Sequence, residues 1–266
     1  MTLTARGMLN KVPEVTLYFW VIKILCTTVG ETASDYLSET LGWGLTNTTY
    51  ATAAILIAVL GVQFGLRRYV PAVYWTAVVL ISVVGTQITD NLVDNQGVAL
   101  RTTVIVFSIA LAAAFAAWYG SERTLSIHTI VTTRREAFYW LTILLTFALG
   151  TAAGDYLAEA LAIGYGKSAL LFGAAIAVVT VAHLRLRMNA VLAFWAAYVL
   201  TRPLGASVGD HLSQPTGDGG LGWGTTMTSL VFLTTILALV AFLSMTRRDV
   251  IPATPLVPSV APDGAS

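Results

Sequence analysis

The sequence is short of charge and of cysteine. Only 11% of its 266 residues are charged, against about 25% in a typical soluble domain. The single cysteine, Cys26, forms no internal disulfide, and a formal net charge of +1 excludes the basic surface of a nucleic-acid-binding domain. Because 56% of the residues are hydrophobic, a disordered chain is also excluded. The composition predicts an integral membrane protein whose partner is the lipid bilayer, with no nucleic acid partner.

Three common sequence motifs of enzymes are missing too. The chain has no complete Walker phosphate-binding loop, no HExxH pair and no CxxC pair. We therefore predict that it is not an enzyme, and we assign no catalytic and no cofactor-binding residue. Clustered thiolates and imidazoles, which suit zinc and copper, are lacking as well.

Long apolar stretches are what the sequence does contain. A membrane-spanning helix needs about 20 mostly apolar residues. The sequence predicts an all-α polytopic membrane protein with eight transmembrane helices, over residues 15–37, 49–66, 73–92, 98–118, 137–157, 168–184, 190–212 and 225–245. Residues 249–266 contain four prolines and no periodic apolar pattern, so we expect a disordered cytoplasmic tail.

Basic residues predict the orientation of these spans, because cytoplasmic loops carry the excess of Lys and Arg. The side of the termini has 11 of the 15 basic residues, and the opposite side has only Arg101 and Lys167. Both termini are therefore expected in the cytoplasm. The two remaining basic residues, Lys23 and Arg202, fall inside spans.

The odd-numbered spans share one motif. Trp20 precedes Gly30 by ten residues and Asp35 by fifteen. The same spacing recurs in Trp75, Gly85 and Asp90, in Trp140, Gly150 and Asp155, and in Trp195, Gly205 and Asp210. The chain is thus predicted to hold four two-helix repeats, in halves of residues 1–120 and 121–248. Since each unit has two spans, all four enter the membrane in the same direction, as parallel repeats around a pseudo-symmetry axis.

Two segments also carry a family resemblance. Residues 11–37, KVPEVTLYFWVIKILCTTVGETASDYL, and residues 194–212, FWAAYVLTRPLGASVGDHL, are similar to bacterial membrane-anchored proteins built from four tandem two-helix repeats of unassigned function. The resemblance covers about residues 11 to 248. It implies eight helices and a bacterial inner (plasma) membrane, and it implies no activity.

The glycines and tryptophans of the motif are explained by structural roles in the membrane. Small residues four apart let helix backbones approach closely in lipid. We assign this helix-packing role to Gly30, Gly85, Gly150, Gly154, Gly205 and Gly209. The four tryptophans lie near the cytoplasmic start of each odd span, where we expect them to form an interfacial aromatic belt.

The acidic residues are harder to explain by packing. A carboxylate inside a span costs roughly 2.5–3.5 kcal/mol on insertion scales, yet every unit keeps one. A second polar residue follows one turn later, and the first unit adds a further acid. We predict cation ligands at Asp35, Asp90, Asp155, Asp210, Glu31, Glu39, Asp94 and Glu159. Alternatively, the outer acids are solvated helix ends and the aspartates make caps or interhelical hydrogen bonds.

Lys23 and Arg202 are predicted to balance part of this negative charge. Lys23 and Glu31 are eight residues apart, close to two helical turns, and Arg202 and Asp210 have the same separation. The sequence thus predicts the pairs Lys23–Glu31 and Arg202–Asp210. In an alternative arrangement, Lys23 extends along the helix to the cytoplasmic face.

Three functions are compatible with this pattern. The first is a transporter or channel for cations, either a divalent metal such as Mn²⁺ or Mg²⁺ or protons, because hard cations prefer oxygen ligands. The divalent cation would be a substrate and not a cofactor. The second is a membrane scaffold or helper protein whose charges hold the bundle together. The third is an exporter of a small molecule or lipid intermediate, with Lys23 and Arg202 holding an anion in a wide apolar cavity.

Overall fold

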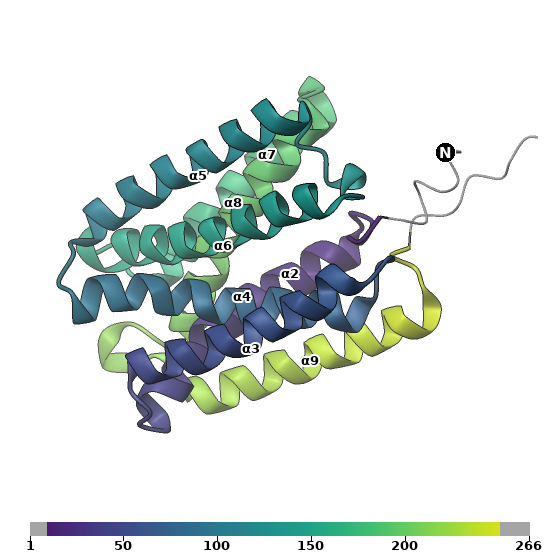
Figure 1. Cartoon of the computed structure of the whole chain (residues 1–266). Coiled ribbons are helices and arrows are strands. Elements are labelled where there is room, and N and C mark those ends of the chain that lie inside the picture. Colours follow the sequence, from purple (N-terminus) through teal and green to yellow (C-terminus); the bar gives the residue numbers. More distant parts are fainter. Residues whose placement is uncertain (1–9, 251–266) are drawn as a thin grey trace, which may run out of the picture.

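The computed structural model describes residues 10–250, and within that range the regular structure is entirely helical (Figure 1). The long helices are α2 (Leu17–Asp35), α3 (Leu45–Gly65), α4 (Pro71–Asp90), α5 (Leu100–Glu122), α6 (Thr133–Asp155), α7 (Tyr165–Leu186), α8 (Ala190–Ser213) and α9 (Gly224–Thr246). Short 3₁₀ helices η3 (Ile127–Thr129) and η5 (Thr216–Asp218) lie in connecting loops. The predicted all-helical class is confirmed. The expected tail lies outside the described residues from 251 onward.

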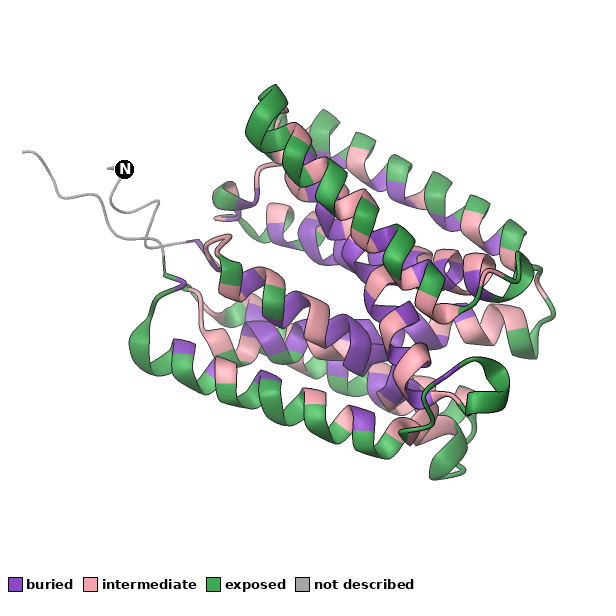
Figure 2. Ribbon diagram, turned by 180° about the vertical axis from the view of Figure 1, so that it is seen from behind, coloured by how far each residue is buried: buried purple, intermediate pink, exposed green. Residues whose placement is uncertain are grey.

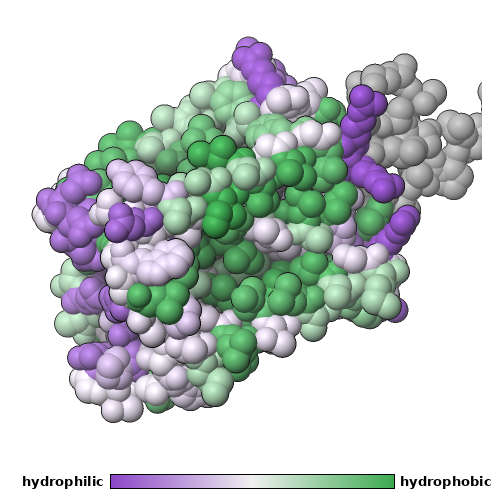
Figure 3. Space-filling model, turned by 60° about the horizontal axis from the view of Figure 1, so that its bottom comes forward, coloured by the Kyte–Doolittle hydropathy of each residue, from purple (hydrophilic) through white to green (hydrophobic). Residues whose placement is uncertain are grey.

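Helices α3 to α9 are long and apolar enough to cross a membrane. Helix α2, which carries Lys23, Glu31 and Asp35, is not among them. An apolar band runs across the surface between two hydrophilic ends (Figure 3). These features are compatible with a membrane protein.

The helices divide into an inner and an outer set. More than half of the residues of α2, α4, α6 and α8 are buried, whereas α3, α5, α7 and α9 are largely exposed and surround them (Figure 2). Each inner helix is the first helix of a repeat and each outer helix is the second. The exposed side chains of the outer set are mainly apolar, including Ile57, Leu170 and Leu237.

The inner helices contact one another in a closed ring. Helix α2 packs against α4 and α8, and α6 also packs against α4 and α8. Each outer helix packs on the inner helix of the next repeat: α3 on α4, α5 on α6 and α7 on α8. Helix α9 completes the series by returning to α2. The two described ends of the chain therefore meet, and the Glu14 amide donates a hydrogen bond to the Asp249 carbonyl at 2.9 Å.

The motif glycines lie where the inner helices touch. A Cβ atom added to Gly30 would overlap Ser82, and one added to Gly85 would lie 2.6 Å from the Phe147 Cβ. The remaining two contacts join Gly150 to Arg202 and Gly205 to Thr27. In every case the partner lies seven residues after the tryptophan of the next repeat. Glycine is needed at these positions because any side chain would separate the two backbones.

The tryptophan prediction was wrong for three of the four residues. Trp75, Trp140 and Trp195 are only 1%, 3% and 5% exposed, so they do not form an interfacial belt. The cause is an aromatic residue that precedes each tryptophan and packs on the tryptophan of the next repeat. These ring pairs are Phe19–Trp75 at 5.7 Å, Tyr74–Trp140 at 5.5 Å, Tyr139–Trp195 at 6.3 Å and Phe194–Trp20 at 5.6 Å between centroids.

Candidate functional site

A polar cavity of 330 Å³ opens at the end of the inner helices opposite the chain termini. Its walls come from all four repeats. Every predicted cation ligand lines it: Glu31, Asp35, Glu39, Asp90, Asp94, Asp155, Glu159 and Asp210. The fold therefore gathers into one cavity the acids that the sequence spreads over 180 residues.

The acids lie at graded depths. Glu31 and Asp210 are 6% and 7% exposed and form the inner part of the cavity. Asp35, Asp90 and Asp155 are partly buried. The outer acids, Glu39, Asp94 and Glu159, are exposed at the mouth.

Wide helical turns place the outer acids. Directly after the motif aspartate, three inner helices continue as π-helices: η1 (Tyr36–Thr40), η2 (Asn91–Asn95) and η4 (Tyr156–Ala160). Each is closed by a bond across five residues, as between the Leu41 amide and the Tyr36 carbonyl at 2.9 Å. Such turns occur frequently at functional sites. Helix α8 lacks this turn and ends at Ser213, next to Gln214, which takes the place of an outer acid.

An inner triad has the geometry of a cation site. One carboxylate oxygen from each of Glu31, Asp155 and Asp210 lies within 4.8 Å of the other two. Oxygen ligands of this kind bind Ca²⁺ at 2.3–2.6 Å and Mg²⁺ at 2.0–2.1 Å. A single cation between the three oxygens would therefore reach all of them with small side-chain movements.

The motif aspartates have no protein partner among the described residues. The side chains of Asp35, Asp90, Asp155 and Asp210 make no hydrogen bond and no ion pair with residues 10–250. They make neither the helix caps nor the interhelical bonds of the alternative interpretation. Their oxygens are left facing the cavity.

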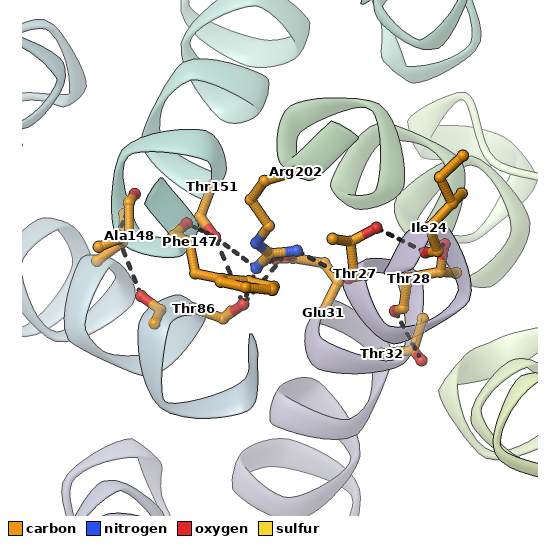
Figure 4. Close-up of polar contacts among 12 residues, drawn as sticks. Ile24, Thr27, Thr28, Glu31, Thr32, Thr86, Phe147, Ala148, Thr151 and Arg202 are labelled. Atoms are coloured by element: carbon orange, nitrogen blue, oxygen red, sulfur yellow. Dashed lines mark hydrogen bonds and ion pairs between the residues drawn. The ribbon is translucent and has the colours of Figure 1, made fainter. Parts of the chain in front are cut away.

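Arg202 does not line the cavity itself, but it bonds to the lining residue Glu31, and we call this bonded group the floor (Figure 4). The Arg202 guanidinium is fully buried and donates to the Thr27 carbonyl at 2.8 Å, to Glu31 Oε2 at 2.8 Å and to Thr151 Oγ1 at 2.6 Å. It also donates to Thr86 Oγ1. One arginine of the fourth repeat thus bonds to the inner helices of the other three.

The predicted pair between Arg202 and Asp210 is wrong, because Arg202 pairs with Glu31 instead. Eight residues along a helix amount to about 12 Å, which two side chains do not easily span. The close contact of Gly205 with Thr27 brings α2 against α8 and puts Glu31 within reach of the guanidinium. Thr86 and Thr151 were not predicted as partners of Arg202, although both occupy the position of Glu31 in their repeats, eleven residues after the tryptophan.

Lys23 lies below this floor and has no carboxylate partner. Its side chain is 1% exposed, and the Nζ atom has no hydrogen-bond partner among residues 10–250. The Nζ atom lies 4.2 Å from the centre of the Phe147 ring and 4.3 Å from that of Tyr198. Both the predicted pair with Glu31 and the alternative extension to the cytoplasmic face are therefore wrong. Aromatic rings, which attract cations weakly, replace the carboxylate.

The far end of the ring is closed by aromatic side chains. The hydroxyls of Tyr74 and Tyr139 lie 2.5 Å apart, and both residues are fully buried. Together with the ring pairs of the four tryptophans, they fill the space between the inner helices. The acidic cavity thus opens toward one end of the molecule.

A second, apolar cavity of 510 Å³ lies beside the ring, between α2, α7, α8 and the loop around η3. It resembles the wide apolar cavity expected of a small-molecule exporter. However, neither Lys23 nor Arg202 lines it. The anion-holding role of these two residues in that hypothesis therefore loses its geometric basis.

Residues 205–209 read Gly-x-Ser-x-Gly, the pattern of a hydrolase nucleophile turn. In that class the serine lies on a sharp strand-to-helix turn. Here Ser207 is buried within α8. The pattern is therefore a packing sequence in this chain.

Comparison with known proteins identifies the repeat. The family described as Repeat of Unknown Function (DUF347) matches residues 18–69, 73–124, 138–189 and 193–249. No curated protein and no solved structure matches the chain. The four matched segments coincide with the four units, each an inner helix followed by an outer helix.

Proposed function

The chain belongs to the DUF347 repeat family, and we propose that it is a membrane transporter that binds a divalent cation in the acidic cavity. The proposal assigns eight transmembrane helices to four parallel repeats around a pseudo-fourfold axis. The axis passes through the ring of inner helices and the cavity lies on it.

Equivalent contacts between successive repeats support the pseudo-fourfold arrangement. The glycine contacts, the aromatic pairs and the packing of each outer helix all run from one repeat to the next and return from the fourth to the first. Interfaces that join different patches head to tail form a closed ring when the rotation closes. The motif aspartates then occupy equivalent helix positions around the axis, and Asp210 is the most buried of the four.

Charge at the two ends supports the orientation. The basic residues around the C-terminal ends of α3, α5, α7 and α9 share the end of the molecule that holds Asn10 and Val250. The acidic cavity is at the opposite end. In a bacterial inner membrane, the positive-inside rule places the termini in the cytoplasm, so the cavity opens to the outside.

The observation that carries the cation proposal is the buried, unpaired carboxylate of Asp210. This carboxylate is 93% buried, lines the cavity beside Glu31 and Asp155, and has no partner among the described residues. A buried ionised carboxylate is stabilised only by a counter-charge or by protonation. Eight carboxylates line the cavity, and the one ion pair that the described residues make with them is Arg202–Glu31. A bound cation would supply the compensation.

Cavity size and closure favour a transporter over an open channel. At about 30 Å³ per water molecule, the cavity has room for roughly ten waters, enough for a partly hydrated divalent ion. Arg202, Lys23 and the aromatic side chains block the axis below it. Release to the other side therefore requires a conformational change.

Cation binding by the purified protein tests the proposal. Titration with Mn²⁺ is expected to show binding to the unmodified protein and at least tenfold weaker binding to the double variant Asp155→Asn/Asp210→Asn. The matched control is Asp218→Asn, which makes the same change in η5, outside the cavity lining. Its affinity should equal that of the unmodified protein.

Two outcomes would contradict the proposal. One is an unmodified protein that binds no divalent cation, and the other is an unchanged affinity in the folded double variant. A scaffold would instead give a lower unfolding temperature for the double variant and no effect of Mn²⁺ on either protein, since a bound ligand raises stability by mass action.

A further inference from the structure

Two cations of different chemical character lie beneath the acidic cavity on one aromatic ring. Lys23 Nζ is 4.2 Å and Arg202 Cζ is 5.5 Å from the centre of the Phe147 ring. A guanidinium stays charged under all ordinary conditions, whereas an amine in a protein interior can lose its proton. Of the two residues, only Lys23 can therefore change its charge during a transport cycle.

We propose that Lys23 is the proton-exchanging group of the transporter, so that binding of a divalent cation in the acidic cavity releases a proton from its ammonium group. This inference rests on the proposed function and adds the coupling ion. One N–H bond of the Lys23 ammonium breaks, the electron pair stays on Nζ, and the proton leaves to solvent.

The surroundings of Lys23 permit this exchange. The titratable or charged groups nearest to it are Arg202 and Tyr198 on α8 and Cys26 on α2 itself, and the hydroxyl pair of Tyr74 on α4 and Tyr139 on α6 lies near Tyr198. Helix α9, which also packs on α2, contains no titratable residue. Because no carboxylate is in this group, loss of the proton breaks no ion pair.

Glu31 connects the cavity to Lys23. Its carboxylate is held by Arg202 at 2.8 Å, and one of its oxygens belongs to the triad with Asp155 and Asp210. A cation in the triad would attract the negative charge that now compensates Arg202. The guanidinium charge would then act more strongly on Lys23 and favour loss of its proton. Such coupling between two sites is reciprocal, so proton binding at Lys23 would favour cation release.

Buried polar atoms mark a route for the proton toward the chain termini. Buried polar groups in proteins nearly always have hydrogen-bond partners. Tyr198, whose ring centre lies 4.3 Å from Lys23 Nζ, is an exception, because its hydroxyl has no hydrogen-bond partner among residues 10–250. The Tyr74–Tyr139 hydroxyl pair adds two further polar atoms within the aromatic layer. In this proposal the three hydroxyls relay the proton, because a hydroxyl both donates and accepts hydrogen bonds.

Proton counting tests the proposal. Mn²⁺ is titrated calorimetrically into the full-length protein in two buffers of different ionisation heat, which gives the number of protons released per bound cation. The unmodified protein is expected to release about one proton more than Lys23→Met and Lys23→Arg. Methionine has no charge and arginine keeps one, so agreement between the variants separates proton exchange from the effect of charge alone.

Equal proton counts in a folded variant and the unmodified protein would overturn the proposal. Failure of the unmodified protein to bind Mn²⁺ would instead reject the proposed function. A second measurement needs no variant and uses vesicles that contain the protein and an internal pH-sensitive dye. An imposed inward Mn²⁺ gradient should drive protons outward and raise the internal pH. Mn²⁺ uptake without a pH change would also overturn the proposal.

Discussion

Glu31 is the residue on which the chemistry of the centre depends. It provides the carboxylate in contact with Arg202, and it is also part of the inner triad. In the other repeats its position is held by Thr86, Thr151 and Ala206. A single acidic residue in one repeat therefore makes the four units unequal and gives the floor its charge balance.

Removing only one charge of this pair should be costly. Glu31→Gln leaves Arg202 buried without an anion, and breaking a buried ion pair from one side typically costs about 3–5 kcal/mol. We expect a loss of this order in the free energy of unfolding in detergent. The double variant Glu31→Gln/Arg202→Met should recover most of it, since both charges are then absent.

Glu39→Gln is the control for this experiment, because Glu39 is exposed and makes no ion pair among the described residues. It should change the free energy of unfolding by less than about 0.5 kcal/mol. If Glu31→Gln proves equally neutral, the ion pair does not stabilise the folded state.

At the scale of the helix, the fold depends on how closely the inner helices approach. Gly30 lies against Ser82, and the Ser82 side chain and backbone carbonyl carbon occupy the space that a Cβ would need. Gly61 on the outer helix α3 has the same local conformation, but no atom of another element lies within 4 Å of an added Cβ. Alanine substitution at each of the two glycines therefore separates the effect of packing on stability from the effect of helix propensity.

We expect Gly30→Ala to lower the free energy of unfolding by about 1–3 kcal/mol, the usual cost of overpacking. Gly61→Ala should raise it by roughly 0.5–1 kcal/mol, because alanine favours helix. Chemical unfolding in detergent, followed by circular dichroism, measures both. A Gly30→Ala protein as stable as the Gly61→Ala protein would show that the α2–α4 contact relaxes without cost.

The sequence predicted the helices well for a physical reason, and the eight acids proposed as cation ligands line one cavity. No expected helix boundary differs from the observed one by more than four residues, because long apolar stretches bounded by polar residues mark the helices. The four motif aspartates follow their tryptophan by fifteen residues and the three outer acids by nineteen, so equivalent helices bring them to one cavity, which Glu31 joins four residues before Asp35. The π-turns after Asp35, Asp90 and Asp155 could not be predicted, since a change to bonds across five residues has no sequence marker.

The partners of Lys23 and Arg202 were not predictable from spacing along one helix. Both residues face neighbouring helices, and those neighbours are set by the glycine contacts of the whole ring. The buried tryptophans have the same explanation, because each ring partner belongs to a different repeat. Pairing across repeats requires the order of the helices around the centre, which a spacing within one helix does not contain.

At the scale of the molecule, the interface between the last repeat and the first resembles the other three. Helix α9 packs on α2 as α3 packs on α4. The Glu14 amide and the Asp249 carbonyl, 2.9 Å apart, bring the two described ends together. A loop between two successive repeats can therefore be cut, and the original termini joined, without changing how the repeats pack.

A circular permutant that starts at Asn189 and joins the original termini through a flexible linker should fold and bind Mn²⁺ with unchanged affinity. Its first helix is then α8, which enters in the same direction as α2. A permutant that starts at Gly219, between α8 and α9, is the control. Its new termini lie at the acidic end, against the charge bias of the loops, so we expect little folded protein. Membrane yield and Mn²⁺ titration compare the two, and similar yields would contradict this reasoning.

The return of α9 to α2 also has a consequence for synthesis. Helix α2 emerges from the ribosome before the other described helices, and its cover, α9, emerges after them. Until then Lys23, Glu31 and Asp35 lie on a helix that is not apolar enough to be stable in lipid by itself. The nascent first helix must therefore wait at the insertion machinery, or at the edge of the bilayer, until the later helices surround it.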